Sequence, residues 1–255
     1  MDIQELVEMT LSEVKERYPS AFTLYSSLPE TLPKEEILSA NRKNHEIGAL
    51  RQYMFDGMMF AIPPGVFSPG DTSEAVFKNI INRNIDVRDK NVLVMGCGAG
   101  IETILIARNG AKSICAIDID KVSVAATEAN FRDYIPEKQH GILRVIASDL
   151  CVSVEGTFDL ILFNPPAVSI RISDDPAIVR NTSIGTPILT RLLSQIRDKH
   201  LLAPNGLLLV IVSNTAELRK IVSHSLVLGF TPSIQATVSS SQHERLKTFA
   251  ISFRI

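Results

Sequence analysis

The sequence lacks the features by which several classes of protein are recognised. It contains no tryptophan, only three cysteines, and no apolar run long enough to cross a bilayer. Cys97, Cys115 and Cys151 share no CxxC or Cys/His spacing, so we expect reduced thiols, no metal site and no disulfide framework. The N-terminus, MDIQELVEMT, is acidic and amphipathic, unlike a secretory signal peptide. These absences favour a cytoplasmic protein.

An excess of charge of one sign is also missing. The chain carries 26 Lys and Arg against 28 Asp and Glu, a formal net charge of −2. No global basic field therefore indicates nucleic-acid binding, although a local basic face stays open. With 45% hydrophobic and 21% charged residues, the 255 residues fit one large globular domain, or one domain with a small appendage.

Two parts of the chain differ in pattern. Residues 1 to about 60 predict helices: the first is stopped by Pro19, and the second follows Pro33 and runs to about Met54. The apolar face of the first helix would comprise Ile3, Leu6, Val7, Leu11 and Val14. From residue 91 apolar strands alternate with helices, and two strands close the chain as an antiparallel pair. This alternation predicts a parallel sheet with both faces covered, so we divide the chain into 1–60 and 61–255.

A glycine-rich turn joins the first strand of this series to the helix after it. In VLVMGCGAGIETILIA, Gly96, Gly98 and Gly100 allow a tight turn and close approach of a ligand near a helix N-terminus. The dinucleotide fingerprint GxGxxG would place its third glycine at position 101, which is Ile101. The pattern here is GxGxG, which alone is weak evidence for a nucleotide-type ligand.

Carboxylates follow the next two strands. Asp118 lies 22 residues after Gly96, where a carboxylate can accept both hydroxyls of an adenosine ribose. The alternative is that Asp118 or Asp120 caps the next helix, a role that fits Asp120 better. Asp149 ends the third strand in ASDL and could accept from an adenine amino group while Leu150 covers the ring. An ordinary loop aspartate remains the alternative for Asp149.

The fourth strand ends abruptly in FDLILFNPPAVSI. Five of the six residues before Asn164 are apolar, and two prolines follow it, which cannot continue a central strand. Asn164 offers a side-chain oxygen, and Pro165 a carbonyl freed from strand pairing, as two acceptors for an NH2 group. Such a pair could orient a planar amine by positioning alone. The alternative for Asn164 is a turn cap, common before proline.

Together, GxGxG, Asp118, Asp149 and NPPA after successive strands resemble the class I S-adenosylmethionine-dependent methyltransferases over about residues 61 to 255. The NPP motif makes the chain most similar to the HemK/PrmC-type glutamine N5-methyltransferases, as do VFSPGDT, AIDIDKVSVAATEAN and LLAPNGLLLVIV. The resemblance implies a Rossmann-like, doubly wound, mostly parallel seven-stranded sheet with a closing antiparallel strand. We expect the helical N-terminal segment to cover or recognise the substrate; the alternative is a stabilising cap that makes no contact with it.

The resemblance further implies S-adenosylmethionine as the cofactor and assigns it a site. The methionine moiety would lie along the glycine turn, the ribose on Asp118, and the adenine beside Asp149. The acceptor would meet the NPP segment, with Thr72 as a further contact. The residues expected to bind the cofactor are Gly96, Cys97, Gly98, Ala99, Gly100, Asp118, Ile119, Asp149, Leu150 and Asn164. Those expected to bind the acceptor are Asn164, Pro165, Pro166, Ala167 and Thr72. Asn164 and Pro165 are the expected catalytic pair.

Two positions depart from that family. Val94 stands where the family carries an acid near the ammonium of the cofactor, and Glu102 or a backbone carbonyl could substitute for it. Ala167 stands where the family usually carries an aromatic residue that stacks on the group being methylated, which would widen the pocket. The acceptor is thus open between a protein glutamine and a small metabolite, with an rRNA base amine third because of the neutral charge balance.

Two other classes of function compete with methyl transfer. A non-catalytic S-adenosylmethionine-binding or scaffold protein would explain Val94 and Ala167 as decay, but the retained Asn164, Pro165 and Asp118 oppose it. A nicotinamide oxidoreductase is disfavoured by Ile101 and by the lack of a catalytic Tyr/Lys or His/Asp arrangement.

Overall fold

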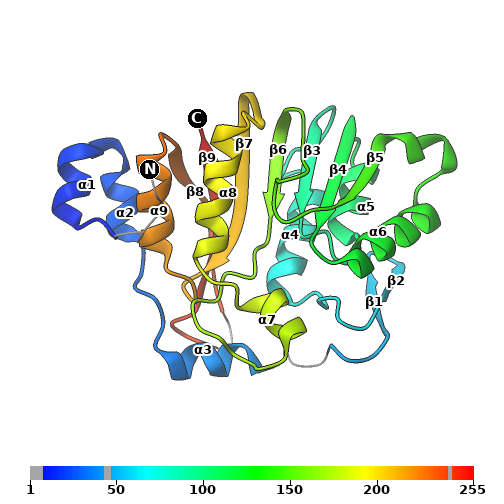
Figure 1. Cartoon of the computed structure of the whole chain (residues 1–255), viewed down its shortest axis with the longest axis horizontal. Coiled ribbons are helices and arrows are strands. Elements are labelled where there is room, and N and C mark those ends of the chain that lie inside the picture. The colour runs from blue at the N-terminus through cyan, green and yellow to red at the C-terminus, as the bar shows by residue number, and fades with distance from the viewer. Residues whose placement is uncertain (1–7, 43–46, 241–242) are drawn as a thin grey trace.

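A seven-stranded sheet forms the centre of the protein (Figure 1). The computed structural model describes residues 8–42, 47–240 and 243–255. Strand order is β5-β4-β3-β6-β7-β9-β8, where β3 to β7 are parallel and β9 runs antiparallel between β7 and β8. The predicted fold class is confirmed. The strands are β3 (Asn91–Met95), β4 (Ser113–Asp118), β5 (Leu143–Ala147), β6 (Phe158–Phe163), β7 (Leu202–Ser213), β8 (Thr231–Ser239) and β9 (Lys247–Arg254).

Helices cover both faces of the sheet, because successive apolar residues of each central strand point to opposite sides. Val92 and Val94 of β3 join a hydrophobic cluster with α4 (Asp71–Ile81), α5 (Ile101–Arg108) and α6 (Lys121–Tyr134). Leu93 and Met95 join the other cluster, with α8 (Pro187–Asp198) and α9 (Leu218–Val227). At about 25 cal/mol per Å² of buried apolar surface, these two clusters supply the main stabilisation of the fold.

The first helices of the chain pack beside α9. They are α1 (Leu11–Arg17) and α2 (Phe22–Ser27), so Leu11 and Val14 are helical as predicted, whereas Ile3, Leu6 and Val7 lie outside the described residues. The buried Tyr25 hydroxyl donates to the carbonyl of Met9 and accepts from the Ser223 hydroxyl of α9. Buried side chains of α1 and α2 belong to the same cluster as those of α9. This pair of helices is therefore bound to the sheet side remote from α4.

The prediction of one helix from Pro33 to Met54 is wrong. Helix α3 (Lys34–Ala40) begins after Pro33 as expected, but β1 (Arg51–Phe55) and β2 (Met58–Ile62) form an antiparallel hairpin. Its two-residue turn is Asp56-Gly57, and both have positive φ, 49° and 73°. Asp-Gly between alternating apolar residues is a sequence signal for such a hairpin, so this element could have been recognised.

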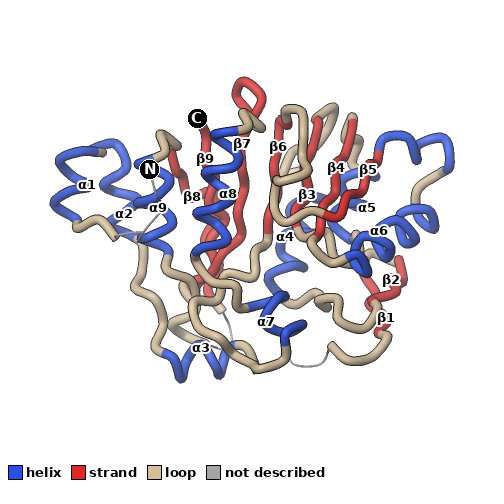
Figure 2. Tube along the Cα trace, in the orientation of Figure 1, coloured by secondary structure: helices blue, strands red, loops and turns tan. Residues whose placement is uncertain are grey.

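The functional edge of the sheet is the one at which the parallel strands end. Helix α3, α7 (Pro176–Thr182) and the β1–β2 hairpin all lie along this edge, at the bottom of Figure 1. Loops make up most of the chain there, in contrast to the strands above them (Figure 2). Within the described residues no helix is both long and apolar enough to span a membrane. The carboxyl edge of a parallel sheet is where such folds bind ligands.

Candidate active site

One continuous hollow of about 1230 Å³ includes this edge and extends along the α4 side of the sheet as far as Lys90 and Asp159. It is lined by the glycine turn after β3, the ends of β4, β5 and β6, the start of α4, and α7. Every residue predicted for the site lines it except Gly100; the lining residues include Gly96, Cys97, Gly98, Ala99, Asp118, Ile119, Asp149, Leu150, Asn164, Pro165, Pro166, Ala167 and Thr72. Gly100 belongs to the same turn and begins α5.

The glycine turn has the backbone conformation that its sequence predicts. Gly96, Gly98 and Gly100 have φ of 64°, 53° and 81°, in the left-handed region that other residues rarely adopt. A Cβ at Gly100 would lie 2.9 Å from the Cα of Thr127, so α6 packs directly on the turn. Thr127 donates to the carbonyl of Gly98, and Asn130 donates to the carbonyl of Ala99. The turn is thus held by two side chains of α6, and the N-terminus of α5 beside it has no side-chain cap.

Asp118 and Asp120 make different contacts, and the contact of Asp120 is the helix cap that the sequence predicts for it. The oxygens of Asp118 accept from the backbone N–H groups of Gly98 (3.0 Å) and Asp120 (2.9 Å). A carboxylate has about four lone-pair positions, so each oxygen can also accept one ribose hydroxyl. Burial raises the pKa of the Asp118 carboxyl, against these hydrogen bonds, which lower it. Asp120 caps α6 by accepting from Val122 N–H, which confirms the capping role predicted for it.

Asp149 lies at the rim of the hollow and is about half exposed. Its carboxylate forms an ion pair of 2.6 Å with Arg191 of α8, a partner that could not be predicted from the order of residues. Leu150 has φ of 51° and only 7% of its surface is exposed, so it forms part of the floor beside Asp149. Ile119, by contrast, is 57% exposed next to Asp118. Ile119 therefore offers an exposed apolar side chain to the hollow, and Asp149 offers a carboxylate that can accept hydrogen bonds.

The NPP segment lies directly beside the glycine turn. Met95 and Phe163 are register partners in β3 and β6, so Gly96 and Asn164 follow neighbouring strand ends. The amide nitrogen of Asn164 donates to the hydroxyl of Ser73 on α4, at 3.3 Å. Because the nitrogen is occupied, the side-chain oxygen of Asn164 remains available to an incoming N–H group. Ser73, which is buried, was missed because 91 residues separate the two partners.

The expectation that the Pro165 carbonyl is free is only partly correct. It accepts from the N–H of Ala167 at 2.8 Å, which leaves one of its two lone pairs. The Pro166 carbonyl accepts from Ile184 and Gly185, so the turn before α8 fixes the segment. Ala167 pairs with Ser183 and is 4% exposed. Its small side chain is therefore packed in the core, and the segment is rigid.

A buried carboxylate without a partner lies on the α5 side of the hollow. Burial raises the pKa of Glu102 to about 7, and among the described residues no side chain pairs with it. Val94 is buried in the sheet beneath the turn. Every other buried or half-buried acid at this end is engaged: Asp118 and Asp120 as above, and Glu74 by Tyr53 and Lys78.

The thiols take no part in this chemistry. All three cysteines are free and buried. Burial raises the pKa of both Cys97 and Cys151 to about 12, so neither is a thiolate near neutral pH. In the part of the chain that the structure describes, no group of His, Cys, Asp and Glu side chains could hold a metal ion.

The fold and this cleft define a class I methyltransferase, and comparison with known proteins agrees. A solved ribosomal protein L11 methylase from Lactobacillus delbrueckii subsp. bulgaricus has a TM-score of 0.52 and 25% identity, over 76% of this chain and 84% of that one. The model of the family "Methyltransferase small domain" matches residues 57–228. The chain belongs to this family and is an S-adenosylmethionine-dependent methyltransferase.

Two relatives differ in the acceptor that their names give. The "Putative protein N5-glutamine methyltransferase" of Methanocaldococcus jannaschii is 29% identical over 189 residues, 71% of this chain and 89% of that protein. The "Ribosomal RNA small subunit methyltransferase C" of Mannheimia succiniciproducens is 36% identical over 106 residues, 40% of this chain and 29% of that protein. The similarity to the glutamine methyltransferase thus spans most of both chains.

Proposed function

We propose that the protein methylates the side-chain amide nitrogen of a glutamine in a protein substrate. The observation that carries this proposal is the hydrogen bond from the amide nitrogen of Asn164 to Ser73, which would leave the side-chain oxygen for the NH2 group of the methyl acceptor. The long match to a glutamine methyltransferase supports the same acceptor. An amide NH2 has two N–H bonds, and the Asn164 oxygen with the remaining lone pair of the Pro165 carbonyl would accept one each.

The catalytic contribution of these two groups is orientation. In an amide the nitrogen lone pair is delocalised, so the NH2 group must be turned until that lone pair points at the methyl group. S-adenosylmethionine supplies the electrophilic methyl group on its sulfonium. Asn164 and Pro165 would hold the nitrogen in line, and the rigid segment around Ala167 would prevent it from rotating away. The extra proton of the nitrogen leaves to water after transfer, so no strong base is required.

The cofactor fits the other half of the hollow. We assign the methionine moiety to the turn from Gly96 to Gly100, the ribose to Asp118 and the adenine to the space between Ile119 and Asp149 with Leu150. Glu102 takes the place that Val94 leaves: its unpaired carboxylate would bind the ammonium group of the cofactor. The left-handed glycines and the double acceptor at Asp118 are the features of this chain that fit S-adenosylmethionine.

Part of the N-terminal segment would guide the acceptor. Ile37 of α3 shares a hydrophobic cluster with Ile172 and Ile178 of the α7 region, next to the NPP segment. Helices α1 and α2 instead pack on α9. Within the predicted segment 1–60 we therefore propose α3, rather than α1 or α2, as the cover over the acceptor. The boundary near residue 60 stays a prediction.

The rRNA base amine remains the second candidate, since a relative named as an rRNA methyltransferase matches 40% of the chain. The net charge of −2 offers no general attraction for RNA. A labelled-methyl assay with glutamine peptides, ribosomal RNA and a metabolite extract separates the possibilities. We expect label on peptide, located by mass spectrometry on a glutamine side-chain nitrogen. Label confined to RNA or to a metabolite would contradict the proposal.

A further inference from the structure

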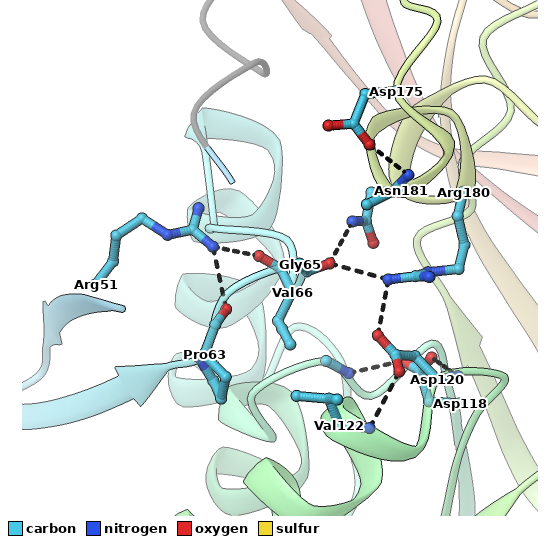
Figure 3. Close-up of polar contacts among 12 residues, drawn as sticks. Arg51, Pro63, Gly65, Val66, Asp118, Asp120, Val122, Asp175, Arg180 and Asn181 are labelled. Carbon is cyan, nitrogen blue, oxygen red and sulfur yellow. Dashed lines mark hydrogen bonds and ion pairs between the residues drawn. The ribbon is translucent and has the colours of Figure 1, made fainter. Parts of the chain in front are cut away.

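A single arginine side chain joins three segments of the chain beside the hollow: α7, the loop at Gly65 and the residues after β4 (Figure 3). Arg180 is on α7, and its Nη2 lies 2.7 Å from Asp120 Oδ2 and 3.2 Å from the carbonyl oxygen of Gly65. The adjacent Asn181 donates to the same Gly65 carbonyl at 2.8 Å. Gly65, Asp120 and Arg180 are far apart in the chain, so these contacts hold together segments that no strand or helix joins. We call this set of contacts the Arg180 clasp.

The Gly65 side of the clasp is itself fixed. Gly65 has φ of 80°, and its N–H donates to the carbonyl of Ile47 at 2.7 Å. Arg51 of β1 donates to the carbonyls of Pro63 and Val66 on either side of it. Val66 in turn lies against the glycine turn, since a Cβ at Gly98 would be 3.8 Å from its Cγ1. The loop that carries the Gly65 carbonyl is therefore held in place by these hydrogen bonds, and it lies next to the glycine turn.

The Asp120 side of the clasp leads to the ribose-binding position. Asp120 Oδ1 caps α6 through Val122 N–H, while Oδ2 takes Arg180, so both oxygens are used. The backbone N–H of Asp120 donates to Asp118 Oδ1 at 2.9 Å. Arg180 thus acts on the end of β4 two residues after the carboxylate that we assign to the ribose. The side chains of Arg180 and Asp120 are 35% and 16% exposed, so the pair is shielded more than an ordinary surface ion pair.

We propose that Arg180 is a positioning residue that holds the cofactor cleft closed, by fastening the Gly65 loop to the end of β4. This inference rests on the assignment of Asp118 to the ribose and is independent of the acceptor. With the clasp made, α7 and the Gly65 loop border the path by which the cofactor enters and leaves. Exchange of spent S-adenosylhomocysteine for fresh cofactor then requires the Arg180–Asp120 contact to break. Because α7 follows the NPP segment in the chain, an acceptor that contacts α3 or α7 would act on the helix that carries Arg180.

Stopped-flow binding of S-adenosylhomocysteine tests the clasp without any acceptor. Arg180→Ala should raise the dissociation rate about tenfold while the association rate changes less than about threefold, because a closing contact acts mainly on release. Arg180→Lys should recover part of the effect, since an ammonium keeps the charge but loses the planar fork. Arg171→Ala is the matched control: that arginine precedes α7, and its contacts within the described residues are with Ser173 and Asp174.

Asp120→Asn guards against a trivial loss of fold. An asparagine oxygen can still cap Val122 N–H, while the charge that pairs with Arg180 is gone. Adding Arg180→Ala to Asp120→Asn should then raise the dissociation rate by clearly less than it does in the wild type. Raising the salt concentration should speed release from the wild type and not from Arg180→Ala. If Arg180→Ala and Asp120→Asn both release S-adenosylhomocysteine at the wild-type rate, the inference is overturned, even if the glutamine acceptor proves correct. If the variants change the release rate as expected but the protein does not methylate glutamine, only the proposed function is overturned.

Discussion

The two halves of the cleft are built in different ways. Most of the cofactor half is made by segments close in sequence: the glycine turn, α5 and the end of β4 all lie between Val94 and Asp120, and only Asp149 and Leu150 come from further on, after β5. The acceptor half joins segments far apart, as in the contact between Ser73 and Asn164. A short motif can therefore specify the first half, whereas the second depends on how α3, α4 and α7 are placed by the rest of the fold. Changes in the two halves should have separable effects on cofactor binding and on methyl transfer.

The largest expected effect in the cofactor half is on stability, at Gly100. In Gly100→Ala the new Cβ meets the backbone of Thr127 and φ is positive, so we expect a loss of about 3 kcal/mol in the free energy of unfolding. Gly156→Ala is the control, because φ is 97° there but nothing lies within 4 Å of the added Cβ. It should lose about 1 kcal/mol. Urea unfolding measures both, and equal losses would show that contact with α6 is unimportant.

Asp118→Ala should weaken S-adenosylhomocysteine binding about 100-fold, because two charge-assisted hydrogen bonds to the ribose are lost. Calorimetric titration of the variant measures this. The rate of methyl transfer at saturating cofactor should change far less. If the transfer rate fell as much as the affinity, Asp118 would not belong to the cofactor half alone.

Glu102→Gln should weaken S-adenosylhomocysteine binding about tenfold at pH 7.5, as expected for loss of a partly screened ion pair with the ligand ammonium. A ligand without the amino group, 5′-methylthioadenosine, should bind both forms alike. The exposed Glu155→Gln is the control for loss of charge. Equal weakening for both ligands would place Glu102 elsewhere.

The same carboxylate predicts the pH dependence of the unliganded protein. The pKa of Glu102 is raised from 4.5 to about 7 in the folded state, so the folded protein binds an extra proton between these values. Its contribution to stability is therefore present below pH 4.5 and is lost as the pH rises through 7. Glu102→Gln should remove this decline, and urea unfolding at pH 5.5 and 8 would reveal it. Parallel curves for the wild type and the variant would contradict the raised pKa.

The smallest expected effect compares two neighbours in the acceptor half. Ser73→Ala should lower kcat about fivefold with no change in cofactor affinity, because the Asn164 amide loses one weak hydrogen bond that fixes its orientation. Thr72→Ala changes the residue that the family resemblance suggested as a further contact of the acceptor. Kinetics at saturating cofactor rank the two. A larger effect at Thr72 would favour the original prediction over the contact seen at Ser73.

The sequence predicted the cofactor half and the sheet far better than the acceptor half. Strands and glycine turns are specified by residues next to one another in the sequence, so the seven strands and the tight glycine turn could be predicted from the order of residues alone. The β1–β2 hairpin was missed although Asp56-Gly57 signals it. Ser73, Arg180 and Arg191 were missed for a different reason. Each forms a hydrogen bond with a partner more than 40 residues away in the sequence, and only folding brings the two together.

The division of the cleft is tested most directly by Asn164→Ala, with S-adenosylhomocysteine affinity and single-turnover methyl transfer to a glutamine peptide measured on the same preparation. Removing the acceptor that orients the NH2 group should slow transfer about 1,000-fold, the scale of lost positioning. The dissociation constant of the cofactor product should stay within about threefold of the wild type. Comparable losses of affinity and rate would contradict the account, because Asn164 would then serve the cofactor or the fold rather than the acceptor.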